Sequence, residues 1–150
     1  MIFTLNGQVV DKEVAPNETL LDFLRDDLRQ TSAKKGCDEG ECGTCTVLLD
    51  GKPVNACLIL AVQVEDREVT TLEGLSRNGK PDAIQQAFLD NYGYQCGFCT
   101  PGVILVTKAL LDRVPSPSED QIKEALEGNL CRCTGYQQII ESVLKAADAR

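Results

Sequence analysis

The cysteines of this 150-residue chain fall into two separate groups of four, and their spacing constrains the fold more than any other feature. The first group reads C-x4-C-x2-C-x11-C and comprises Cys37, Cys42, Cys45 and Cys57. The second group combines a C-x2-C with a later C-x-C and comprises Cys96, Cys99, Cys131 and Cys133. No cysteine is left over, and the chain has no histidine. Each group therefore has the spacing of a four-thiolate metal site, which the surrounding fold must bring together.

Composition and charge permit a packed core but argue against nucleic acid as a partner. Apolar residues make up 43% of the chain, so a core is feasible. The 15 basic and 23 acidic residues give a formal charge of -8, and no basic patch stands out. Phosphate binding needs clustered Lys and Arg, so we expect no contact with nucleic acid. The acidic balance instead favours solubility and docking onto basic protein surfaces.

The segment after Met1 indicates the cellular compartment. The chain runs directly into strand-like sequence, without the features of a secretory signal peptide. Its longest apolar stretch, near residues 103–111, is too short to span a bilayer. We therefore expect a soluble, cytoplasmic protein with no membrane span. In that reducing compartment, closely spaced cysteines favour metal or catalytic thiols over disulfides.

Two segments of the first half have the pattern of β-hairpins. Residues 2–14 are β-prone on both sides of Asn6-Gly7, and residues 45–57 are β-prone on both sides of Asp50-Gly51. Such pairs are preferred in the tight turn whose backbone matches the twist of the strands. Both segments are therefore predicted to be antiparallel hairpins.

One helix and one further strand complete the first half. Residues 17–28 place five apolar side chains broadly on one helical face, with Thr19 at the N-cap. Residues 67–72 are expected to form a short strand. Two hairpins and one helix predict a small α+β, mostly antiparallel, domain. We place its end at residue 76, inside a linker over 74–81.

The rest of the chain, residues 77–150, is predicted to be an all-α domain of four short helices. The second of these helices has Thr100 at its N-cap and Pro101 at its first position. The third starts with a capping box of Ser118 and Gln121. Both halves of the second cysteine group then lie at helix boundaries. The chain is thus expected to have two domains, 1–76 and 77–150.

The first cysteine group has the spacing of a plant-type [2Fe-2S] ferredoxin, C-x4-C-x2-C with a distant fourth cysteine. A ligand loop must wrap closely around a cluster, and Gly36, Gly40 and Gly43 allow positive φ angles there. Backbone N–H groups turned toward sulfur would tune the reduction potential. A zinc site usually pairs two short knuckles, which this group lacks.

The second group is ambiguous when its spacing is taken alone. A C-x2-C with a C-x-C also suits a structural zinc site of four thiolates. A thioredoxin-like redox pair at Cys96 and Cys99 is a weaker alternative, because no βαβ pattern surrounds it. Disulfides are weaker still. No catalytic acid–base pair, phosphate-binding loop or activated nucleophile is recognisable, so we expect no substrate-binding catalytic site and no catalytic residue on this chain.

Three segments together resemble a known family over essentially the whole chain. They read "KKGCDEGECGTCTVLLDGKPVNAC", "QCGFCTPG" and "GNLCRCTGY". In order and spacing they are similar to the small iron–sulfur subunit of the xanthine oxidase family of molybdenum hydroxylases. The resemblance assigns a second [2Fe-2S] cluster to the second group. Thr44 departs from it, since the family more often has Ala there.

The resemblance implies a fold, cofactors and partners. The first domain would be a β-grasp, ferredoxin-like fold, and the second a four-helix bundle with its cluster at the helix ends. A large subunit would hold a molybdenum–pterin cofactor, and a medium subunit would usually hold FAD. The chain would be the electron-transfer subunit of a multi-subunit oxidoreductase. Its second cluster would lie nearest molybdenum and its first nearer FAD.

The same resemblance assigns a cofactor contact to two residues. Gln95 matches a glutamine whose side chain contacts the pterin, and Cys133 matches a ligand lying close to the pterin. A loop residue that caps backbone groups is the alternative for Gln95. For the whole chain, a free-standing two-cluster ferredoxin and a zinc-stapled interaction module remain the alternative functions.

Overall fold

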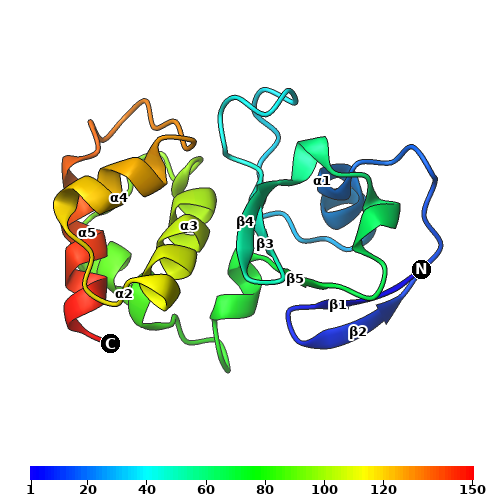
Figure 1. Ribbon diagram of the computed structural model, residues 1–150, viewed down its shortest axis with the longest axis horizontal. Coiled ribbons are helices and arrows are strands. Elements are labelled where there is room, and N and C mark those ends of the chain that lie inside the picture. The colour runs from blue at the N-terminus through cyan, green and yellow to red at the C-terminus, as the bar shows by residue number, and fades with distance from the viewer.

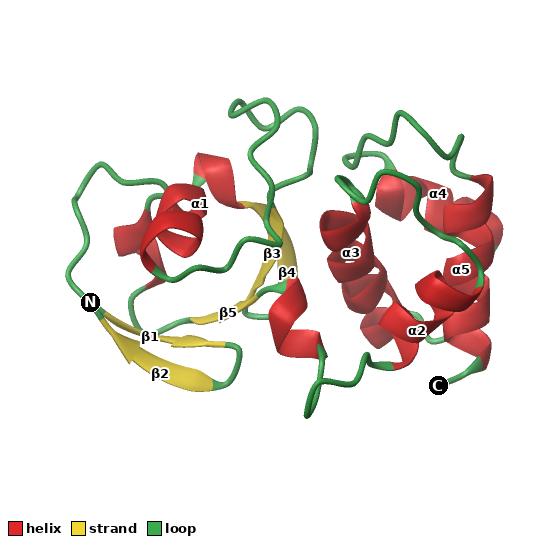
Figure 2. Cartoon of the chain, turned by 180° about the vertical axis from the view of Figure 1, so that it is seen from behind, coloured by secondary structure: helices red, strands yellow, loops and turns green.

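The computed structural model describes residues 1–150 as two halves that lie side by side, one built on a sheet and one built of helices (Figure 1). The sheet has five strands in the order β2-β1-β5-β3-β4. Its strands are β1 (Ile2–Leu5), β2 (Gln8–Asp11), β3 (Thr46–Leu49), β4 (Lys52–Asn55) and β5 (Glu68–Thr70). Figure 2 shows the sheet and the helices from the opposite side. The mixed α and β content agrees with the expected class.

Both predicted hairpins are confirmed. β1 pairs antiparallel with β2, and β3 pairs antiparallel with β4. Asn6 and Gly7 have φ angles of 52° and 78°, and Asp50 and Gly51 have φ angles of 49° and 75°. Two successive positive φ angles define the turn that Asn-Gly and Asp-Gly favour. The local turn chemistry therefore determines both registers.

The two hairpins are joined at the centre of the sheet by β5, the last strand in the chain. β5 pairs parallel with β1 and antiparallel with β3, so it joins the two hairpins into one sheet. The predicted strand at 67–72 is thus present as β5. A mostly antiparallel sheet was expected, and only the β1–β5 contact departs from it.

The helix of the first half packs against the sheet but is not regular. Thr19 caps α1 (Leu20–Asp22), and its Oγ1 accepts the backbone N–H of Asp22 at 3.1 Å. After one turn the chain widens into a π-helical segment, Phe23–Asp27, in which the N–H of Leu28 donates to the carbonyl of Phe23. The side chains directed to the core are fully buried: Leu20, Leu21, Phe23 and Leu24. The predicted cap and apolar face are confirmed, whereas the π-helical segment was not predicted.

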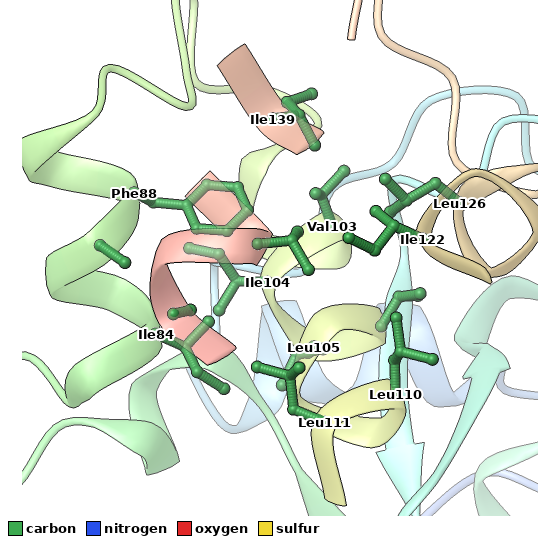
Figure 3. Packing of buried hydrophobic residues seen from close by; sticks show 14 of the residues in the cluster. Ile84, Phe88, Val103, Ile104, Leu105, Leu110, Leu111, Ile122, Leu126 and Ile139 are labelled. Atoms are coloured by element: carbon green, nitrogen blue, oxygen red, sulfur yellow. The ribbon is translucent and has the colours of Figure 1, made fainter. Parts of the chain in front are cut away.

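The second half contains four helices around one apolar core. They are α2 (Ala83–Asp90), α3 (Thr100–Arg113), α4 (Glu119–Leu126) and α5 (Gln137–Asp148). Figure 3 shows side chains from all four helices meeting in this core, among them Phe88, Ile104, Ile122 and Ile139. Leu48 of β3 belongs to the same core, so the sheet and the helices share buried surface.

The capping box of Ser118 and Gln121 is confirmed at the start of α4. The expected N-cap of α3 is wrong by one residue. Cys99 holds the cap position with helical φ and ψ angles of -80° and -19°, so the chain turns helical before it reaches Thr100. A capping side chain needs an extended backbone, and Thr100 lacks it. Its buried hydroxyl consequently has no hydrogen-bond partner.

A membrane-crossing helix would need a length and an apolar character that none of the helices has.

Candidate functional site

The first cysteine group is brought together by a loop and a hairpin. Cys37, Cys42 and Cys45 lie in the loop that leads into β3, and Cys57 lies just after β4. Because β3 and β4 pair in antiparallel register, the residues that flank them meet, and the N–H of Ala56 donates to the carbonyl of Cys45. The Cys45 thiol contacts that of Cys57 and interacts with that of Cys42. The thiols of Cys37 and Cys42 also interact with each other, so the four sulfurs lie in two neighbouring pairs.

Backbone N–H groups point at the sulfur of Cys37. The N–H groups of Glu41 and Cys42 donate to it at 3.3 Å and 3.4 Å. The N–H of Glu39, followed by that of Cys42, lowers the pKa of the Cys37 thiol to about 7. Hydrogen bonds to the charged form favour a thiolate. This sulfur is therefore prepared to bind metal as an anion.

Cys45 has the opposite pKa shift from Cys37 in the same group. Its side chain is buried, and burial raises the pKa of its thiol to about 12. A buried thiol gives up its proton when a metal replaces it. The thiol with the lowered pKa, Cys37, is thus half-buried, whereas Cys45, with the raised pKa, is buried.

Two glycines of the loop are required for different reasons. Gly43 has a φ angle of 67°, and a Cβ there would lie 2.1 Å from the carbonyl oxygen of Gly128. Gly36 does not have the positive φ angle that was expected for it. It is needed for space, because a Cβ would lie 2.7 Å from Thr44 Oγ1 and 2.8 Å from Cys42 Sγ. Gly40 has the expected positive φ angle, 86°.

The second group assembles where three helices end or begin. Cys96 and Cys99 precede α3, and Cys131 and Cys133 lie between α4 and α5. The Cys99 thiol contacts Cys131 and interacts with Cys96, and the Cys133 thiol contacts Cys96. Cys99 is buried, whereas Cys96 and Cys133 are exposed. The second group therefore has a buried side and an open side.

The pKa values of this group follow its burial and hydrogen bonds. Burial raises the pKa of the Cys99 thiol to about 12. Burial also acts to raise the pKa of Cys131, but hydrogen bonds from the side chain and backbone of Thr134 outweigh it and lower that pKa. Hydrogen bonding with Cys96 raises the pKa of Cys133. Cys131 is thus the thiol of this group that the protein prepares for ionisation.

One tyrosine fixes the loop that carries Cys131 and Cys133. The Tyr136 hydroxyl accepts the N–H of Cys131 and donates to the carbonyl of Asn129, each at 2.9 Å. Tyr136 itself has a φ angle of 67°, which turns the chain into α5. Sequence reasoning did not assign this role, although the tyrosine closes the "CRCTGY" segment.

The two groups are joined directly through the backbone. The N–H of Leu130, next to Cys131, donates to the carbonyl of Cys42 at 2.9 Å. The buried Asn129 side chain donates to the carbonyl of Gly43 at 2.9 Å and to Thr46 Oγ1 at 3.3 Å. Figure 1 shows the cyan loop of the first group and the orange loop of the second at the same edge of the molecule. None of these three hydrogen bonds was predicted, since each joins residues more than 80 positions apart.

The residues present fit a [2Fe-2S] cluster at each group. Such a cluster takes four thiolates, two on each iron, so it needs pairs of sulfurs rather than a single point of convergence. Within each group the thiols interact in pairs, Cys37 with Cys42, Cys45 with Cys57, Cys99 with Cys131 and Cys96 with Cys133. All eight cysteines are unbridged. Backbone donors such as the N–H of Glu41, which bonds to the sulfur of Cys37, would stabilise the negative charge of the thiolates.

Gln95 and Cys133 lie on the open side of the second group. Both side chains are exposed. Exposed apolar side chains accompany them in the two loops of the group, Phe98 in one and Leu130 in the other. The structure therefore leaves Gln95 accessible to another chain.

Family models match both halves of the chain. Residues 3–76 match a model described as a 2Fe-2S iron-sulfur cluster binding domain, and residues 71–144 match one described as a [2Fe-2S] binding domain. The matches cover the two cysteine groups separately. Two [2Fe-2S] domains are thus present, as the sequence motifs predicted.

Proteins of known activity are similar over almost the full length. The nicotinate dehydrogenase small FeS subunit of Eubacterium barkeri is 50% identical over 144 residues, which cover 96% of this chain and 92% of that protein. The xanthine dehydrogenase iron-sulfur-binding subunit of Escherichia coli O157:H7 is 45% identical over 143 residues, with 94% and 89% covered. Quinoline 2-oxidoreductase from Pseudomonas putida 86 contains a chain that superposes with a TM-score of 0.96 at 42% identity, with 99% and 93% covered.

These relatives are subunits of multi-subunit dehydrogenases and oxidoreductases, and they align with this chain from end to end. The predicted family, the electron-transfer role and the two-cluster composition are confirmed by them. The chain belongs to the xanthine oxidase family, in which it is the small [2Fe-2S] iron–sulfur subunit that transfers electrons within a molybdenum hydroxylase complex.

Proposed function

We propose that all eight cysteines are iron ligands, four for each cluster. The first cluster would be held by Cys37, Cys42, Cys45 and Cys57. The second would be held by Cys96, Cys99, Cys131 and Cys133. The pairwise contacts among the thiols in each group support this assignment. When bound, each cluster accepts and releases one electron at a time, which lets a two-electron oxidation be drained in single steps.

The open side of the second group is proposed to face the large molybdenum–pterin subunit. The exposed Gln95 and Cys133 would contact the pterin, and the exposed Phe98 and Leu130 would be covered by the partner. Apolar side chains of this size are often exposed singly, but at interfaces they form the buried centre. The first group would then lie nearer the FAD of a medium subunit.

A short connection between the two groups supports relay through this chain. From the sulfur of Cys42 the route follows covalent bonds to its carbonyl, crosses the 2.9 Å hydrogen bond to the N–H of Leu130, and continues to Cys131. The contact is held in place by the buried Asn129 next to it. The residues of the chain thus supply a fixed path between the two ligand sets.

We further infer the finer description of the two halves. Residues 1–76 would be a β-grasp domain, supported by the sheet order and by β5 lying parallel to β1. Residues 77–150 would be a four-helix-bundle domain, supported by the core shared among α2, α3, α4 and α5. Limited proteolysis of the loaded protein should cut first between residues 76 and 82. A first cut elsewhere would contradict that boundary.

The cytoplasm is the proposed compartment. Eight unbridged cysteines suit a reducing environment. Substrate selectivity would reside in the large subunit that holds molybdenum. The substrates named for relatives, such as nicotinate, caffeine and quinoline, belong to those complexes.

Affinity purification through a tag on this chain tests the assembly. We expect iron, molybdenum and FAD to co-purify in a fixed ratio with two further chains. A lone chain that carries iron and passes electrons between soluble proteins would instead establish the free-standing ferredoxin. A colourless chain that carries zinc would establish the interaction module.

Substitutions in the complex test the ligand assignment and the proposed role of Gln95. Cys99→Ser should remove the second cluster only and stop electron flow from molybdenum to flavin, while Cys45→Ser should remove the first only. Gln95→Ala should keep both clusters and alter turnover or a midpoint potential. If neither quantity changes, Gln95 does not contact the pterin.

A further inference from the structure

We propose that two threonine hydroxyls, those of Thr44 and Thr134, set the reduction potentials of the two clusters. Thr44 Oγ1 lies 3.1 Å from the sulfur of Cys42, and Thr134 Oγ1 lies 3.1 Å from the sulfur of Cys131. Each group therefore has one side-chain hydroxyl against one of its sulfurs. The inference rests on the proposed ligand assignment and extends it to two residues that are not ligands.

The hydrogen bonds of Thr134 determine the direction of its hydroxyl. Its Oγ1 accepts the backbone N–H of Tyr136 at 3.1 Å. This contact occupies a lone pair and leaves the hydroxyl proton for the sulfur of Cys131, which is within reach. An iron-bound thiolate carries no proton. Thr134 is therefore the donor of the hydrogen bond to Cys131.

Thr44 has the same contact but a competing acceptor. Its Oγ1 also lies 3.2 Å from the carbonyl of Lys34, within range for donation. The N–H of Lys34 in turn donates to the carbonyl of Thr44 at 3.0 Å, which holds the two residues together. A hydroxyl has one proton, so Cys42 and the Lys34 carbonyl share it. Thr44 is buried, with 6% of its surface exposed, so bulk water does not compete for the hydroxyl proton.

The two environments predict unequal effects on the clusters. Adding one electron places more negative charge on the cluster and its thiolates, so a donor to sulfur stabilises the reduced form more than the oxidised form. The hydroxyl proton stays on its oxygen, so only an electron is transferred. Thr134 gives its proton to Cys131 alone, whereas Thr44 divides its proton. Thr134 should raise the potential of the second cluster more than Thr44 raises that of the first.

Redox titration of the purified, iron-loaded complex measures this effect. Thr134→Val and Thr44→Val are compared with the unaltered protein, using dithionite as reductant and electron paramagnetic resonance to follow each cluster. At a fixed ambient potential, the reduced-to-oxidised ratio of the second cluster should fall at least threefold in Thr134→Val. That change corresponds to a potential about 28 mV lower, at about 59 mV per tenfold. The first cluster should shift less in Thr44→Val.

Two control variants separate the hydroxyl from the general effect of substitution. Thr134→Ser keeps a hydroxyl and should keep the potential. Thr100→Val removes a buried hydroxyl that follows Cys99 but has no hydrogen-bond partner, and both potentials should stay unchanged. If Thr134→Val fails to load iron, Thr134→Ala replaces it with the same expected shift.

The outcomes distinguish this inference from the proposed function. If the unaltered complex lacks two cluster signals, the proposed function itself is wrong. Two normal signals whose potentials do not move in the valine variants overturn only the role of the threonines. The same holds if Thr100→Val shifts the second cluster as much as Thr134→Val, or if Thr44→Val has the larger effect.

Discussion

The backbone N–H of Leu130 donates to the carbonyl oxygen of Cys42 at 2.9 Å, and this single hydrogen bond joins the loop of one cysteine group to the loop of the other. Leu130 precedes Cys131 directly, so only one peptide unit separates the bridge from the second group. The side chain of Leu130 is 56% exposed and is not needed for the contact. The backbone can therefore be tested separately from the side chain.

Leu130→Pro removes the donor, because proline has no backbone N–H. We expect both clusters to remain loaded and electron transfer between them to slow. Rapid mixing of the complex with its substrate, followed by electron paramagnetic resonance at both clusters, measures that rate. Leu130→Ala keeps the N–H and loses the same exposed side chain, so it controls for any lost contact with the large subunit and should transfer electrons between the clusters at the normal rate. Equal rates in the proline and alanine variants would show that the hydrogen bond is not part of the route.

Asn129→Ala tests the contact that holds the two halves together. The buried amide donates to Gly43 and Thr46, so its loss removes two buried hydrogen bonds between the halves, while the Gly43 carbonyl still accepts from the Thr46 hydroxyl. Such a loss costs about 1–3 kcal/mol. In a chain of this size it should lower the Tm of the loaded protein by several degrees. Asn55→Ala is the control, because Asn55 donates to Gly40 within the first half only. An Asn129 variant as stable as the unaltered protein would refute the role given to this amide.

Gly43→Ala should destabilise the protein for two reasons. The left-handed backbone costs a side chain about 1–2 kcal/mol, and the overlap with the Gly128 carbonyl adds about 1–3 kcal/mol. Gly128→Ala is the matched control, since a Cβ there meets no atom within 4 Å. Urea unfolding and the iron content of both variants measure the difference. Equal stability and equal iron content in the two alanine variants would show that position 43 does not require glycine.

Removal of iron should reveal unequal thiol reactivity. With a pKa of about 7, Cys37 is roughly half thiolate at neutral pH, so it should be alkylated quickly and faster as the pH rises from 6 to 8. Cys45 and Cys99, with pKa values near 12, should remain largely protonated and unmodified over that range. Mass spectrometry after brief treatment with iodoacetamide gives the labelled fraction at each cysteine. Uniform labelling would contradict these environments.

Local rules predicted much of the fold from the sequence. The Asn6-Gly7 and Asp50-Gly51 turns, the Thr19 cap and the Ser118 capping box each depend on residues that are neighbours in the chain. The Thr100 cap failed because the Cys96–Cys99 loop had already entered helical geometry before the helix began. Cysteine spacing and glycines predicted the metal-binding character of the loops for the same local reason.

Contacts between segments far apart in the chain could not be predicted from local sequence patterns. The parallel pairing of Thr4 with Glu68 and the bridge from Leu130 to Cys42 join distant segments, and no local pattern marks them. In the sequence, Asn129 and Tyr136 belong to the "GNLCRCTGY" segment, but nothing local assigns a role to either residue. Their roles emerged once the fold placed Asn129 beside Gly43 and the Tyr136 hydroxyl beside Cys131.

Iron analysis combined with electron paramagnetic resonance shows whether each cysteine group holds its own two-iron cluster. We expect about four iron atoms per chain and two distinct signals after reduction, one of which is lost in Cys45→Ser and the other in Cys99→Ser. About two iron atoms with a single signal, or zinc in place of iron at either group, would show that the chain does not hold two such clusters.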